Sequence, residues 1–139
     1  MSSNTINIPT IAVEGAKQVA SAALAEARKN GWTMAVAVVE PSGTLVYYEK
    51  MDETQSGSAH VCIDKARSAA LFKRPTKAFQ DALAGGGSGL RILSLQGAVP
   101  VEGGLPLMVG GKFAGAIGVS GGTSEQDGQC AQAGVDALR

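Results

Sequence analysis

The only histidine of the chain, His60, is the side chain best suited to proton transfer or metal binding. A neutral imidazole can act as a general base, as a metal ligand or as an axial ligand to haem iron. Asp64 follows it by one helical turn and could orient the ring. A single histidine without further ligands at metal spacing cannot form a zinc site. Three interpretations of His60 therefore stay open: a base, a haem ligand, or a polar surface residue near a helix start.

A second candidate is the basic pair Lys73–Arg74, which precedes Pro75 and Thr76 at the predicted start of a helix. Two cations beside the free amides of a helix N-terminus suit a carboxylate or a phosphate. The other interpretation is a solvated turn in which Thr76 is an ordinary N-cap. Gly103–Gly104, directly before a predicted strand, is a third candidate, because a glycine loop can bring backbone amides close to a ligand.

Two glycine motifs resemble catalytic sequences but fail in their context. Gly111–Lys112 is not a phosphate-binding loop, because Pro106 stands where its first glycine is required. Residues 118–122 match Gly-x-Ser-x-Gly, but hydrolases of that kind need a histidine after the serine, and His60 precedes it. We interpret these glycines as scaffold, and we expect Gly115 and Gly118 to let a helix or another subunit approach the strand closely.

The composition describes a folded domain with little charge. The 139 residues are 45% apolar and 17% charged, and twelve basic residues balance twelve acidic ones. A net charge of zero offers no electrostatic footprint for nucleic acid or for an anionic membrane, so neither partner is expected. So little charge also predicts that part of the surface is hidden in a homo-oligomer.

The N-terminal sequence predicts a cytoplasmic protein. Residues 1–10, MSSNTINIPT, contain neither a basic region nor an apolar one, so we expect no signal peptide. No apolar run reaches the length of a membrane span. Cys62 and Cys130 form no CxxC motif and are expected to be reduced thiols.

Residue patterns place the candidates on alternating helices and hairpins. The predicted helices are 11–28 with Thr10 as cap, 57–72 with Ser56 or Ser58 as cap, a short helix capped by Thr76, and one from a capping box at Ser124–Asp127 to Leu138. The predicted hairpins pair Thr33–Val39 with Thr44–Met51 around residues 41–43, and Leu105–Val109 with Lys112–Ser120 around Gly110–Gly111.

Two segments lie outside these predicted helices and hairpins. Residues 84–89, AGGGSG, are predicted to form a flexible loop, and residues 90–104 to be irregular with a short strand. Hairpins require an antiparallel sheet. The sequence therefore predicts one α+β domain over residues 1–139, with helices covering the sheet.

Four blocks of the sequence resemble a known family. They are residues 36–52 (VAVVEPSGTLVYYEKMD), 65–76 (KARSAALFKRPT), 103–122 (GGLPLMVGGKFAGAIGVSGG) and 126–134 (QDGQCAQAG). In order and spacing they resemble the GlcG/HbpS-like family, also called the haem-degrading domain family, to which the PduO C-terminal domain belongs. Glu40 departs from the pattern, which usually has Asp before the hairpin turn. The resemblance implies a profilin-like antiparallel sheet of about five strands in a homo-oligomer, a dimer or larger, up to an octamer.

For function, the resemblance implies a cytoplasmic, oligomeric accessory protein that binds haem or a related tetrapyrrole. A cleft between subunits, lined by Ala, Gly and Met, would hold the macrocycle, and Lys73 and Arg74 would face its propionates. His60 would be the iron ligand, with Thr76 as a weak oxygen donor at most. Gly103 and Gly104 would border the ligand.

Two alternatives from other classes stay open. The first is a small enzyme of a catabolic pathway that acts on an organic carboxylate. There His60 would be the base, the Lys73–Thr76 turn would hold the anion, and the amides of Gly103–Gly104 would stabilise an enolate or oxyanion. The second is a structural partner protein without small-molecule chemistry. The sequence does not decide whether the protein is an enzyme.

Overall fold

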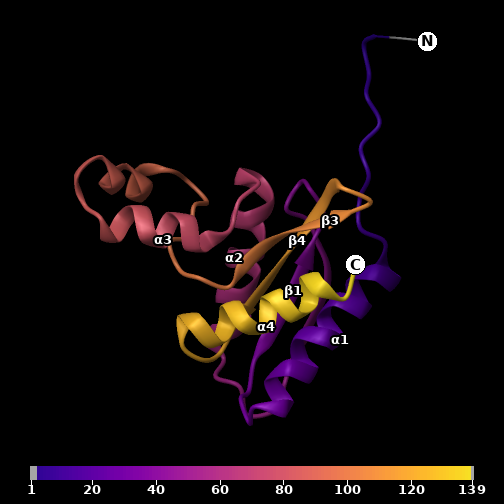
Figure 1. The fold of residues 1–139 in the computed structure, drawn as a ribbon, viewed down its shortest axis with the longest axis vertical. Coiled ribbons are helices and arrows are strands. Elements are labelled where there is room, and N and C mark those ends of the chain that lie inside the picture. The colour runs from indigo at the N-terminus through magenta and orange to yellow at the C-terminus, as the bar shows by residue number, and fades with distance from the viewer. Residues whose placement is uncertain (1–2, 139) are drawn as a thin grey trace.

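The computed structural model describes residues 3–138, in which one antiparallel sheet lies between helices (Figure 1). The helices are α1 (Val13–Lys29), α2 (Gly57–Phe72), α3 (Thr76–Ala84) and α4 (Ser124–Asp136), with a 3₁₀ helix, η1, at Gly87–Ser94. The strands are β1 (Ala35–Val39), β2 (Leu45–Lys50), β3 (Gly104–Val109) and β4 (Lys112–Ser120). Their order in the sheet is β2-β1-β4-β3, so the two predicted hairpins are joined through β1 and β4.

The central strands β1 and β4 are largely buried, and the side chains of β1 alternate between two separate cores. Val36 and Val38 pack with residues of α1 and α4. Ala35, Ala37 and Val39 pack with residues of α2. Every residue of β1 is buried, as a central strand covered on both sides requires. The α2 core consists mostly of alanines, which lets that helix lie very close to the sheet.

The predicted close approach to β4 is confirmed at Gly118. A Cβ atom added there would overlap the carbonyl oxygen of Cys62 and lie 2.5 Å from the amide nitrogen of Ala66. Both of these atoms belong to the backbone of α2. The glycine is therefore required by the packing of a helix on a strand and not by a ligand.

The antiparallel sheet flanked by helices is confirmed, but it has four strands among the described residues and not about five. The predicted short strand in residues 90–104 is wrong, since strand β3 begins only at Gly104. Residues 84–89 are not a flexible loop, because Gly87–Ser94 forms η1, which packs on α3. Gly89 permits this contact, as a Cβ there would overlap the carbonyl oxygen of Ala82. The likeness to profilin stays a prediction.

Several helix starts differ from the predictions. Thr10 does not cap α1, whose N-cap residue is Ala12 without a side-chain bond. Ser56 is the N-cap residue of α2 but makes no capping hydrogen bond. Thr76 is the first residue of α3 and not its cap. In α4 the capping box is formed by Thr123 and Gln126, so the predicted box at Ser124–Asp127 is wrong by one residue.

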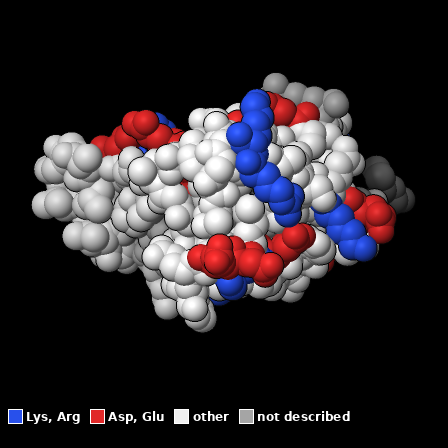
Figure 2. Space-filling view, turned by 90° about the horizontal axis from the view of Figure 1, so that it is seen from below, with Lys and Arg blue, Asp and Glu red and all other residues white. Residues whose placement is uncertain are grey.

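The surface agrees with a chain of zero net charge. On the face shown in Figure 2, basic and acidic side chains form separate small groups on a largely uncharged surface. Among residues 3–138, none of the helices has the length and apolar character needed to cross a membrane.

Candidate functional site

The predicted basic pair lies at the junction between α2 and α3, which we call the basic elbow (Lys73 and Arg74). Lys73 ends α2 in the left-handed conformation, with φ 52° and ψ 43°. Pro75, whose ring fixes φ near −60°, then stands before α3 in the extended region. Both side chains of the elbow are exposed. The local backbone thus turns two cations outward.

The two cations of the elbow line two different pockets. Lys73 borders a pocket of about 570 Å³, here called the lysine pocket, in which its Nζ lies 5.5 Å from the centroid of the Phe113 ring. Arg74 borders a pocket of about 450 Å³, the arginine pocket, and its guanidinium lies 5.5 Å from the centroid of the Phe79 ring. Cations over aromatic faces are attracted by the ring quadrupole. Each pocket therefore combines an aromatic wall with positive charge.

Thr76, Gly103 and Gly104 lie behind the elbow, in the interior. Thr76 is fully buried, and its Oγ1 accepts a hydrogen bond of 2.9 Å from the amide of Gly104. The carbonyl of Gly103 accepts a bond of 3.0 Å from the amide of Val119. These bonds connect α3, β3 and β4. A ligand contact of Thr76 or an oxyanion role of Gly104 stays a prediction, and either would require this bond to break.

His60 lies far from the basic elbow in the same protomer. It occupies the first turns of α2 and is exposed, and its side chain makes no hydrogen bond or ion pair with the described residues. Lys73 follows thirteen positions later, which corresponds to about 20 Å along a helix. One protomer therefore does not gather all the residues predicted to surround a ligand. Within residues 3–138, no group of three or more metal-ligating side chains occurs that could hold a metal ion.

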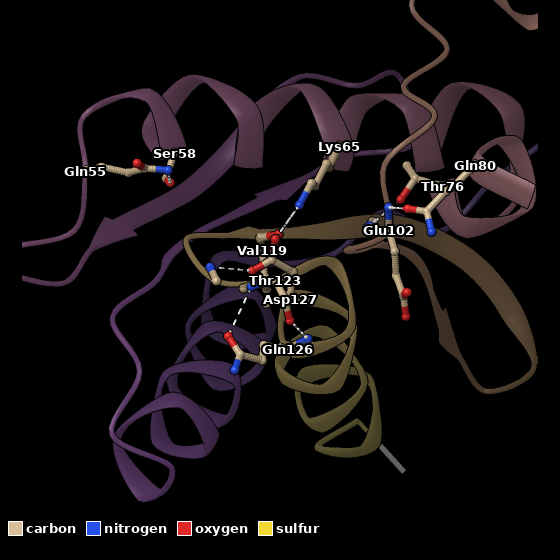
Figure 3. A network of polar contacts seen from close by, with 12 residues as sticks. Gln55, Ser58, Lys65, Thr76, Gln80, Glu102, Val119, Thr123, Gln126 and Asp127 are labelled. Carbon is tan, nitrogen blue, oxygen red and sulfur yellow. Dashed lines mark hydrogen bonds and ion pairs between the residues drawn. The ribbon is translucent and has the colours of Figure 1, made fainter. Parts of the chain in front are cut away.

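The buried ion pair Lys65–Asp127 was not predicted from the sequence (Figure 3). Lys65 Nζ donates to Asp127 Oδ2 at 2.8 Å and to the carbonyl of Val119 at 2.9 Å. The other carboxylate oxygen, Oδ1, accepts from the amide of Gly122 at 2.9 Å. The side chains are only 1% and 4% exposed. The pair links α2 on one face of the sheet to α4 on the other.

The surroundings of this pair indicate a structural role. Burial raises the pKa of Asp127 above its usual value, although Lys65 and the amides of Gly122 and Gly121 act in the opposite direction. Every buried polar side-chain atom in the described chain has a hydrogen-bond partner. A lysine on a helix face otherwise made of alanine, serine and cysteine was the one signal of this pair in the sequence. The sequence pattern around Lys65 does not identify Asp127 as its partner.

The two cysteines are expected to be inert in the native protein. Both are fully buried, and burial raises the pKa of each thiol to about 12. Because the thiolate is the reactive form, we expect neither Cys62 nor Cys130 to react with an aromatic disulfide reagent at neutral pH before the protein unfolds. The measurement is the absorbance of the released thiol over time. Ser21→Cys, at an exposed position of α1, is the positive control.

The same shift predicts a loss of stability at high pH. A thiol whose folded pKa lies above its unfolded value of 9.0 contributes stability below pH 9, and this is lost as the pH rises through about 12.

For the labelling experiment, rapid reaction of both thiols in the native wild type at neutral pH would contradict the expected inertness. It would show that the helices around the thiols open readily.

Comparisons with known proteins agree on one family. The family described as "Haem degrading protein HbpS-like" matches residues 11–136. Protein GlcG of Escherichia coli K12 is 37% identical over 108 residues, covering 75% of this chain and 79% of GlcG. The crystal structure of Klebsiella pneumoniae ORFY is 31% identical with a TM-score of 0.90, over 99% of this chain and 97% of that one.

A third similar protein carries a ligand in its crystal structure. The complex of PduOC with haem is 26% identical to this chain, with a TM-score of 0.83, over 94% of this chain and 96% of PduOC. Over 94% of its length, this chain therefore shares its fold with a protein that has been crystallised with haem.

Proposed function

The chain belongs to the HbpS-like family, and on that premise we propose that it is a cytoplasmic, oligomeric accessory protein that binds haem. The family description and the complex of PduOC with haem support haem as the ligand. The observation in this chain that carries the proposal is the basic elbow, where cations border apolar pockets.

The arginine pocket fits the periphery of a haem but not its iron. Phe72, Phe79, Ile92 and Leu95 supply apolar walls, and Arg74 and Arg91 supply two guanidinium groups suited to propionates. Haem iron needs a His, Cys, Met or Tyr ligand, and no described residue of these types lines either pocket at the elbow. Bound haem would supply an iron centre. At the arginine pocket, the described residues of a single protomer offer this iron no strong ligand.

A second copy of the chain would complete the site. His60 is exposed and unpartnered among the described residues, so it is free to reach a ligand held by a neighbouring subunit. Leu90 and Leu93 lie on η1, whose residues Arg91 and Ile92 line the arginine pocket, and they are 54% and 72% exposed. Apolar side chains at such exposure suit a surface covered in an oligomer. We therefore place haem between subunits, with Arg74 of one protomer at its propionates and His60 of another at its iron.

A haem titration followed at the Soret band tests this proposal. We expect a saturable shift with the wild type and with Lys17→Gln, a control at an exposed site of α1, and loss of the shift with His60→Ala. Because the site takes residues from two subunits, reassembling His60→Ala with Arg74→Gln should restore part of the binding, since some mixed sites contain both wild-type residues.

Each result has a defined meaning. A saturable shift that survives His60→Ala would assign the iron ligand to another residue, Thr76 or a methionine. Failure of the mixed sample to regain haem binding would contradict a site shared between two subunits. Only nonspecific partitioning of haem into wild-type protein would overturn haem binding itself.

A further inference from the structure

We propose that the lysine pocket is a separate binding site for a small organic carboxylate with an apolar body. Four segments far apart in the sequence build it: Asn7–Pro9 of the N-terminal segment, Pro41–Ser42 of the β1–β2 turn, Lys73 at the end of α2, and Lys112–Phe113 at the start of β4. Its volume of about 570 Å³ falls within the range of natural ligand sites. The inference does not depend on haem binding.

The charge of the pocket defines the ligand as an anion. Among residues 3–138, Lys73 and Lys112 are the only charged residues that line it. Neither belongs to the ion pairs of the described chain, which join Lys17–Glu14, Lys29–Glu26, Lys65–Asp127 and Lys77–Asp81. Two unneutralised ammonium groups facing one cavity repel each other. A carboxylate between them removes this repulsion and accepts charge-assisted hydrogen bonds.

Asn7 and Ser42, the uncharged polar residues of the lining, do not neutralise the two lysines. The hydroxyl of Ser42 is already engaged with Thr44 at 2.9 Å and with Glu40 at 3.5 Å. Glu40 itself does not line the pocket. The rest of the lining carries no charge, so the potential in the cavity stays positive.

The apolar walls define the other half of the ligand. Ile8, Pro9, Pro41 and Phe113 surround the space beside the two ammonium groups. Lys73 Nζ lies over the face of Phe113, so the charged end and the aromatic wall are adjacent. A ring or branched chain that carries one carboxylate matches this arrangement, whereas a phosphate alone would leave the apolar walls unused.

The left-handed backbone of Lys73 supports a role for its side chain in the lysine pocket. A left-handed conformation is unfavourable for a non-glycine residue, and glycine is the usual residue where a helix ends in this way. At this position the chain keeps a lysine whose ammonium borders the pocket. This places the anion beside Phe113 and not at Thr76, which is fully buried and does not line the pocket.

Benzoate and its uncharged isostere benzamide are suitable probes, used on the full-length protein. Binding is measured by calorimetry and located by amide shifts in a ¹H–¹⁵N spectrum. We expect benzoate, but not benzamide, to shift the amides of Ser42, Lys73, Lys112 and Phe113 in a saturable way. Lys112→Gln should weaken binding about five-fold, as expected for a partly exposed charge pair. Lys17→Gln, at an exposed site outside the pocket, should bind as the wild type does.

Lys73→Gly separates binding from folding. Glycine accepts the left-handed backbone, so this variant should melt at the same temperature as the wild type or higher, yet bind benzoate more weakly. Equal shifts with benzoate and benzamide would overturn the carboxylate site and leave only apolar partitioning. Unchanged affinity in both Lys112→Gln and Lys73→Gly would overturn it as well. Because the haem titration is a separate measurement, either proposal can fail without the other.

Discussion

Replacing Asp127 with alanine is expected to cost about 3–5 kcal/mol of the free energy of unfolding. The substitution leaves the ammonium of Lys65, which is 1% exposed, with only the carbonyl of Val119 as a partner. It also removes the acceptor for the amide of Gly122. A buried charge without its counter-ion carries most of its desolvation penalty uncompensated. The measurement is denaturation by urea with linear extrapolation to water.

An exposed pair with the same geometry supplies the matched control. Lys77 and Asp81 also lie 2.8 Å apart, but their side chains are 53% and 59% exposed. Asp81→Ala should therefore cost less than about 1 kcal/mol. The double variant Lys65→Met, Asp127→Leu should recover much of the loss, since apolar residues leave no buried charge. If Asp127→Ala costs no more than Asp81→Ala, the pair does not hold the two helical layers together.

The hairpins could be predicted from the sequence because their turns depend on local chemistry. Gly110 and Gly111 have φ values of 58° and 77°, which a two-residue turn between strands requires. Gly43 has φ 86° and closes the β1–β2 turn by donating to the carbonyl of Glu40. Such positions restrict the residue type without reference to the rest of the fold.

The buried ion pair could not be predicted, because its partners are brought together only by tertiary packing. Two overlapping sequences at the start of α4, Thr123–Gln126 and Ser124–Asp127, both satisfy the local rule for a capping box. The structure uses the first, which leaves Asp127 free to turn inward to Lys65. A shift of one residue thus changes Asp127 from a cap into part of the core.

The candidate site was predicted in part. The exposure and charge of the basic elbow follow from its composition, and the structure places both cations at the surface. The separation of His60 from the elbow follows from the length of α2, which the sequence indicated. The proposal that a ligand lies between subunits also depends on which residues line the pockets, and these are known only from the structure. The partnership of Lys73 with Lys112 joins residues from two distant elements, and no local pattern encodes it.

Gly118→Ala is the second substitution with a large expected effect, a loss of about 3 kcal/mol or more. Overpacking of a core usually costs 1–3 kcal/mol, and here the added Cβ meets backbone that has no rotamer with which to adapt. Gly118 pairs with Ala37 on one side and with Gly104 on the other. These small residues form a row across three strands, and α2 lies on it through Cys62 and Ala66.

The loss should appear in urea denaturation as a lower midpoint, and Gly57→Ala is the control. Gly57 is the first residue of α2, and a Cβ there meets nothing within 4 Å. Alanine at that position should be neutral or should stabilise the helix by up to about 1 kcal/mol. A stability of Gly118→Ala equal to that of Gly57→Ala would mean that α2 can move away from the sheet at little cost. That result would also weaken the haem proposal, because the position of the basic elbow depends on where α2 lies.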